Sequence, residues 1–135
     1  DVFKYHWMDE AQHVVLDELE WVAENRRLSA GQKEFVVDDL IALVGAVDGI
    51  LQGQAAADAD YFLAIAGRRF HGEEEAGIRA LVLRAYRWQY IVSGVQHPHF
   101  GRLLTEMTTP AQMIRIQQAL APILRATLPP RRNES

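Results

Sequence analysis

Apolar side chains recur at the helical period of 3.6 residues along most of this 135-residue chain, and no segment shows the alternation typical of a β-strand. The pattern is clearest between residues 30 and 52, where it predicts a helix with one broad apolar face. That face comprises Val36, Val37, Leu40, Leu43, Val44, Val47 and Leu51. We therefore expect an all-α protein, built as a bundle of four to five helices with short connections.

Residue types that start helices mark the predicted boundaries. Ser29 with Gln32, and Thr109 with Gln112, each form the pattern of a capping box, so helices should begin near residues 30 and 110. A first helix is expected over residues 2–26. Residues 55–70 either continue the second helix after a kink or form a separate helix capped by Asp58.

The second half of the chain is predicted with the same signals. Residues 67–72 should form a break, and the glutamates at 73–75 should open a helix whose first turn favours negative charge. This helix is apolar around much of its surface, so we expect it to be the most buried element. Residues 94–101 should form a loop in which Pro98 stops the helix, and Pro122 should bend or end the last helix.

Composition and charge limit the classes of function. The chain is 49% hydrophobic and 24% charged, as in soluble globular proteins, and we expect one helical domain over residues 1–128 with a flexible tail at 129–135. The net charge of −4 disfavours nucleic acid and anionic membrane as partners. No apolar run reaches the roughly 18 residues of a membrane span. The absence of cysteine excludes disulfides and zinc–thiolate sites, and is compatible with a cytoplasmic location.

Three side chains with metal-binding atoms share one face of the first predicted helix. His6, Glu10 and His13 follow one another at positions i, i+4 and i+7, and at about 100° per residue they fall within a sector of roughly 60°. Imidazole nitrogen and carboxylate oxygen suit iron, manganese or zinc. The same stripe continues with acidic residues down to Glu24, so a solvated polar face gives the same pattern. The residues alone leave both interpretations open.

The segment FKYHWMDEAQH, residues 3–13, resembles the last metal-binding helix of ferritin-like di-iron oxygenases. The pattern His-x-x-x-Glu-x-x-His is most similar to that of the p-aminobenzoate N-oxygenase family. The resemblance implies a ferritin-like fold and a di-iron centre that activates dioxygen to oxidise a small-molecule substrate. In that case His6, Glu10 and His13 are ligands of the iron.

The same resemblance implies further ligands that this sequence lacks. The family takes a lone Glu, a second Glu-x-x-His pair and another Glu from upstream helices, and here only His13 has a Glu three residues before it. The chain also begins within a helical pattern and without an initiator Met. We therefore expect an incomplete bundle, completed either by a missing N-terminal part or by a second copy in a homodimer.

Other polar residues suggest sites, each with a structural alternative. His97 and His99 around Pro98 can bind a metal or position a substrate, but a plain turn with solvent-facing imidazoles is favoured. His71 can join Glu74 or Glu75 as a ligand, but a cluster at a helix start is favoured.

Several polar residues on apolar faces are expected to have structural roles. Asp48 lies on the apolar face of its helix and should pair with Arg84 or Arg87, because a buried acid needs a partner. A polar link between Asp58 and Tyr61 is a further expectation. The aromatic residues Tyr86, Trp88 and Tyr90 are assigned to the core.

A second function is compatible with the same residues. The chain can be a metal-free helical interaction module that dimerises through its aromatic helices. The two hypotheses differ at His6, Glu10 and His13. Metal binding requires these side chains to converge with carboxylates from other helices or another chain, whereas the module allows them to face water.

Overall fold

The computed structural model describes the backbone of residues 2–127, and within this range all side chains except those of residues 3 and 7–11. The described residues contain helices and no strand, which confirms the all-α prediction. The elements are α1 (Val2–Arg27), α2 (Ala30–Ile65), α3 (Glu73–Arg87), the π-helix η1 (Trp88–Val92), α4 (Ser93–Val95), α5 (Pro98–Met107) and α6 (Pro110–Thr127). The expected tail at 129–135 lies outside the described residues.

The central element is α2, a helix of 36 residues that spans about 54 Å. It begins at the predicted capping box: the Ser29 N–H donates to Gln32 Oε1 at 2.9 Å, and the Gln32 N–H donates to Ser29 Oγ at 3.4 Å. Of the two expectations for residues 55–70, continuation of the second helix is confirmed as far as Ile65. The predicted break follows, where Gly67 and Gly72 adopt positive φ values of 70° and 53° that favour glycine.

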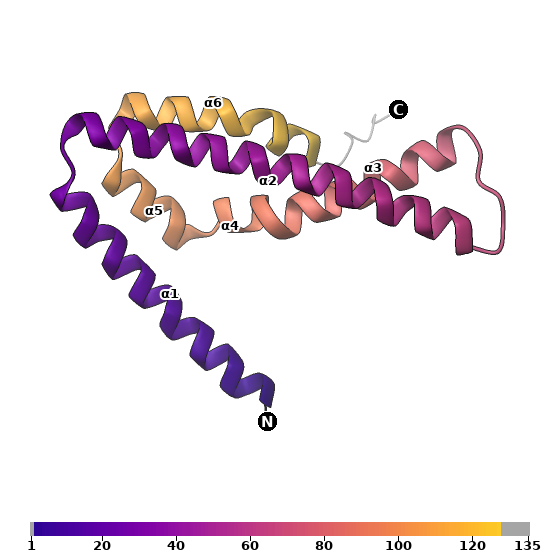
Figure 1. Ribbon diagram of the computed structural model, residues 1–135, viewed down its shortest axis with the longest axis horizontal. Coiled ribbons are helices and arrows are strands. Elements are labelled where there is room, and N and C mark those ends of the chain that lie inside the picture. Colours follow the sequence, from indigo (N-terminus) through magenta and orange to yellow (C-terminus); the bar gives the residue numbers. More distant parts are fainter. Residues whose placement is uncertain (1, 128–135) are drawn as a thin grey trace, which may run out of the picture.

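The chain then returns along α2 as one helical rod formed by α3, η1 and α4 (Figure 1). The expectation that this rod is the most buried element is wrong for α3, which contains no buried residue. The buried cluster lies where α6 covers α2 and η1, and α3 extends beyond that cover (Figure 1). The cluster comprises Val37, Leu51, Ile91, Val92, Ile116, Leu120 and Ile123.

Residues 98–107 form a helix, α5, where the sequence predicted a loop. Pro98 occupies the first turn, where the missing N–H costs nothing, so it starts a helix rather than stopping one. The predicted start of α6 is confirmed, because the Thr109 N–H donates to Gln112 Oε1 at 2.9 Å. Pro122 does not end α6, which continues to Thr127.

The first helix, α1, is the least integrated element. It leaves the rest of the molecule at the short link formed by Leu28 and Ser29 and diverges from α2 (Figure 1). Its main contact is with α5. Large apolar side chains along it remain exposed: Val2, Tyr5, Val14, Val15, Leu16, Leu19 and Trp21. None of the helices in the described part combines the length and apolarity needed to cross a bilayer.

Candidate functional site

The three predicted metal ligands lie on the half of α1 that projects away from the bundle. Because α1 is continuous from Val2 to Arg27, its backbone places His6, Glu10 and His13 on successive turns of one helix. The side chains of His6 and His13 are exposed. The Glu10 side chain lies outside the described part, so convergence of the three stays a prediction. The described side chains include no group of three His, Asp or Glu residues that could hold a metal ion.

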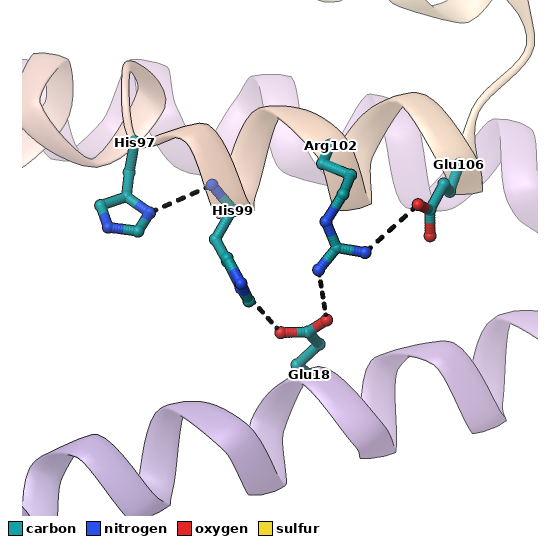
Figure 2. A network of polar contacts seen from close by, with 5 residues as sticks. All are labelled: Glu18, His97, His99, Arg102 and Glu106. Atoms are coloured by element: carbon teal, nitrogen blue, oxygen red, sulfur yellow. Dashed lines mark hydrogen bonds and ion pairs between the residues drawn. The ribbon is translucent and has the colours of Figure 1, made fainter.

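A polar cluster, which we call the Glu18 clasp, joins α1 to α5 (Figure 2). Glu18 Oε2 lies 3.0 Å from His99 Nδ1, and Glu18 Oε1 accepts a hydrogen bond from Arg102 Nη2 at 2.9 Å. Arg102 Nη1 also donates to Glu106 Oε1 at 3.2 Å. One carboxylate on α1 therefore bridges two successive turns of α5.

The electrostatics of the clasp follow from these contacts. Hydrogen bonding from Arg102 lowers the pKa of Glu18, against a smaller effect of desolvation, and His99 lowers it further. The same contact with Glu18 raises the pKa of Arg102. The clasp therefore favours an ionised Glu18 and links α1 to α5.

For His97 and His99 the expected plain turn is wrong, because α5 begins at Pro98, whereas both residues are exposed as expected. His99 contacts Glu18, and His97 caps α5 by accepting the His99 N–H at Nδ1, at 3.3 Å (Figure 2). Neither role was visible in the local sequence. Glu18 is 81 residues away from His99, and the capping role requires the helix that the sequence analysis missed.

An apolar groove, which we call the α1 groove, runs between α1, α2 and α5. It consists of two hollows of about 500 and 480 Å³. The first extends along α1 from Val14 to Trp21 and reaches Tyr90 of η1; the second extends from Trp21 to Leu28 near the link to α2. The side chains that line both hollows are Trp21, Leu43, Phe100 and Leu103. Each hollow is large enough for an organic ligand or several side chains of a partner.

The predicted ion pair of Asp48 is confirmed, and Arg87 is the partner rather than Arg84. Arg87 Nε donates to Asp48 Oδ1 at 2.6 Å and Nη2 donates to Oδ2 at 2.8 Å. Gln52 Nε2 donates to Oδ2 at 2.7 Å. Arg87 lowers the pKa of Asp48 below its usual range more than desolvation raises it. This fully bonded pair joins α2 to α3 and has a structural role.

Asp58 has a partner other than the predicted one. It accepts a hydrogen bond from the Tyr86 hydroxyl on α3 and another from Gln54 Nε2 at 3.0 Å, while Tyr61 is exposed. The contact with Asp58 raises the pKa of Tyr86. The assignment of the aromatic residues to the core is wrong for Trp88 and Tyr90, which are 50% and 65% exposed.

Near the start of α3, the favoured structural interpretation is confirmed. Glu73, Glu74 and Glu75 form its first turn. Glu74 Oε1 accepts a hydrogen bond from Arg68 Nη2 at 3.0 Å. The Glu74 side chain therefore forms an ion pair with Arg68, which lies in the break at residues 67–72.

No protein-family model, curated protein or solved structure matches this chain in the three comparisons made. The residues of α1 and the surfaces around it are therefore the features from which a function can be proposed.

Proposed function

We propose that this chain is a metal-binding protein of the ferritin-like kind, a di-iron oxidoreductase or part of one. In this proposal His6, Glu10 and His13 bind one metal ion from one face of α1. The observation that carries the proposal is the continuity of α1, because an unbroken helix brings positions i, i+4 and i+7 to one side. Two imidazoles and one carboxylate at this spacing match the ligand preferences of iron.

The imidazoles of His6 and His13 and the carboxylate of Glu10 can supply part of the coordination sphere of a metal ion. Imidazole nitrogen and carboxylate oxygen are suited to iron, with manganese or zinc as alternatives, and three ligands on one helix leave positions for others. The described part of this chain offers no additional carboxylate cluster of suitable geometry. The remaining ligands, as we propose, come from another chain or segment packed against the projecting half of α1.

Iron held by carboxylates and imidazoles supplies dioxygen activation, and this chain would contribute positioning and shielding. The helix fixes the spacing of the three ligands, and the Glu18 clasp holds the helix that carries them. A neighbouring acid such as Asp17 can orient the ring of His13, one turn away on α1, by accepting its second N–H. The substrate in this proposal is a small molecule oxidised with dioxygen.

Elemental analysis of the purified full-length protein tests the proposal. We expect iron, manganese or zinc in stoichiometric amounts, and loss of most of it in the Glu10→Ala variant. Glu20→Ala is the matched control, because it removes the same charge from the same helix without touching the proposed ligands. A protein without transition metal, or a Glu10→Ala variant that keeps the full amount, contradicts the proposal.

A second candidate is the metal-free helical interaction module, which the exposed apolar side chains on α1 favour. Val15, Leu16 and Leu19 have no structural reason to be apolar if α1 projects into water. A protein that assembles through α1 and contains no metal supports this candidate. Elemental analysis therefore separates the two functions.

A further inference from the structure

The chain exposes more surface than a folded monomer of its size. Its accessible surface is 10,425 Å², whereas a compact protein of 15.3 kDa exposes about 7,100 Å². The nine residues outside the described ranges account for at most about 1,500 Å² of the excess, even if they are counted as unfolded chain. Roughly 1,800 Å² therefore remains to be explained by the described helices. This is the area that each partner buries in a permanent dimer.

Part of this excess lies on α1, and other exposed apolar side chains lie on α2, α3, η1 and α6. Val14 and Trp21 line the α1 groove and remain 61% and 51% exposed. Leu19 lies about 140° around the helix from Val14 and is 62% exposed. With Val15 and Leu16 it forms a second apolar face, which we call the outer face of α1. One helix therefore presents two apolar faces to water.

The size of the uncovered area decides what kind of partner fits. A small molecule can fill one hollow of about 500 Å³, but it leaves the outer face of α1 exposed. A partner helix can enter the groove, whose floor is formed by Leu43 and Phe100. The same chain therefore has both an exposed apolar face, the outer face of α1, and an open apolar groove, the α1 groove. A twofold contact between two copies covers both at once.

We propose that the α1 groove is filled by α1 of a second copy, which inserts its outer face, Val15, Leu16 and Leu19. By symmetry the first copy does the same in the groove of its partner. A dimer that buries about 1,800 Å² per chain falls within the range of permanent interfaces. This inference does not depend on metal binding, and metal-free protein should form the same dimer.

Sedimentation equilibrium of this 135-residue chain in the presence of a chelator tests the proposal. We expect a mass of twice 15.3 kDa for the wild type. Leu19→Glu places a charge on the outer face and Leu43→Glu places one on the groove floor, and each should raise the dissociation constant about 100-fold or more. Ile114→Glu is the matched control, because Ile114 is 53% exposed on α6, away from the groove.

Engineered cysteines identify the surface even if a charged variant fails to fold. The chain has no cysteine of its own. Mixed copies carrying either Leu19→Cys or Leu43→Cys should form a disulfide between chains on mild oxidation, whereas Leu19→Cys and Ile114→Cys should not. A monomeric wild type overturns the proposal, and so does a dimer that Leu19→Glu leaves intact or in which residues 19 and 43 do not cross-link. Elemental analysis remains a separate measurement, so failure here is distinct from failure of the metal proposal.

Discussion

Asp48 and Arg87 form a largely buried ion pair between α2 and α3. Their side chains are only 11% and 15% exposed, and both Asp48 oxygens accept hydrogen bonds from Arg87. The apolar surroundings explain why neither residue can be removed alone. A lone charge left at this depth has no solvent to compensate it.

Asp48→Ala should therefore lower the free energy of unfolding by about 3 kcal/mol, because it leaves the Arg87 guanidinium without its carboxylate. Denaturant unfolding at neutral pH measures the loss. The double variant Asp48→Leu with Arg87→Met should recover most of it, since it removes both charges and keeps apolar volume. A single variant as stable as the wild type contradicts the structural role of the pair.

The same pair predicts a dependence of stability on pH. Because the folded protein lowers the pKa of Asp48 below 3.8, the ionised carboxylate stabilises the fold above that value. The contribution is lost as pH falls through the lowered folded pKa. An Asp48→Asn variant should therefore show a weaker loss of stability on acidification than the wild type. If the free energy of unfolding falls equally steeply with pH below 3.8 in both proteins, this prediction is contradicted.

At the scale of elements, local signals predicted helix boundaries and missed distant contacts. The capping boxes at Ser29 and Thr109 were predictable, because a cap and its partner lie three residues apart. The ion pair of Asp48 was predictable in kind, because an acid on an apolar face requires a cation. The Glu18 clasp was not predictable, because His99 and Arg102 lie 81 and 84 residues away from Glu18 in the sequence.

Two errors at this scale have specific physical causes. Pro98 fits a helix stop and a helix start equally well, and only the His97 cap distinguishes them. The exposure of α3 depends on where α6 ends along α2, which no local pattern specifies (Figure 1). The candidate metal ligands of α1 were predicted from spacing alone, and both their convergence and the shared ion stay predictions.

The clasp makes a prediction about the attachment of α1. Glu18→Gln removes the charge that Arg102 and His99 contact, so α1 should be held less firmly on α5. Amide hydrogen exchange in residues 12–27 should accelerate severalfold, while exchange in α2 and α6 stays unchanged. Glu20→Gln, which carries the same change on the same helix, is the control. Unchanged exchange in α1 contradicts a role of the clasp in positioning this helix.

Acidification should loosen the same contact. The pKa of Glu18 is lowered from 4.5 in the folded protein, so the clasp is formed above that value. It is lost as pH falls through the lowered folded pKa, and exchange in α1, taken relative to the intrinsic rate of an unfolded chain at each pH, should rise over that interval. The Glu18→Gln variant should show no such rise.

At the scale of the whole molecule, the open groove and the projecting helix (Figure 1) are the features on which the proposed dimer rests. If two copies share the α1 groove, folding and association are coupled, and the thermal midpoint should increase with protein concentration. A dilution series followed by far-ultraviolet circular dichroism measures this dependence. The Leu19→Glu variant should unfold at one midpoint at all concentrations. If the thermal midpoint of the wild type is also independent of concentration, the chain folds as an independent monomer and the prediction is contradicted.

His6 and His13 are two of the five histidines of the chain, and their proposed role as metal ligands can be tested by observing all five imidazole rings at once. Long-range proton–nitrogen spectra of the purified protein during titration with Zn²⁺ report on each imidazole. We predict that the ring nitrogens of His6 and His13 shift together and saturate, while those of His71, His97 and His99 stay unchanged. Rings of His6 and His13 that do not respond, or five rings that respond alike, contradict a metal site on α1.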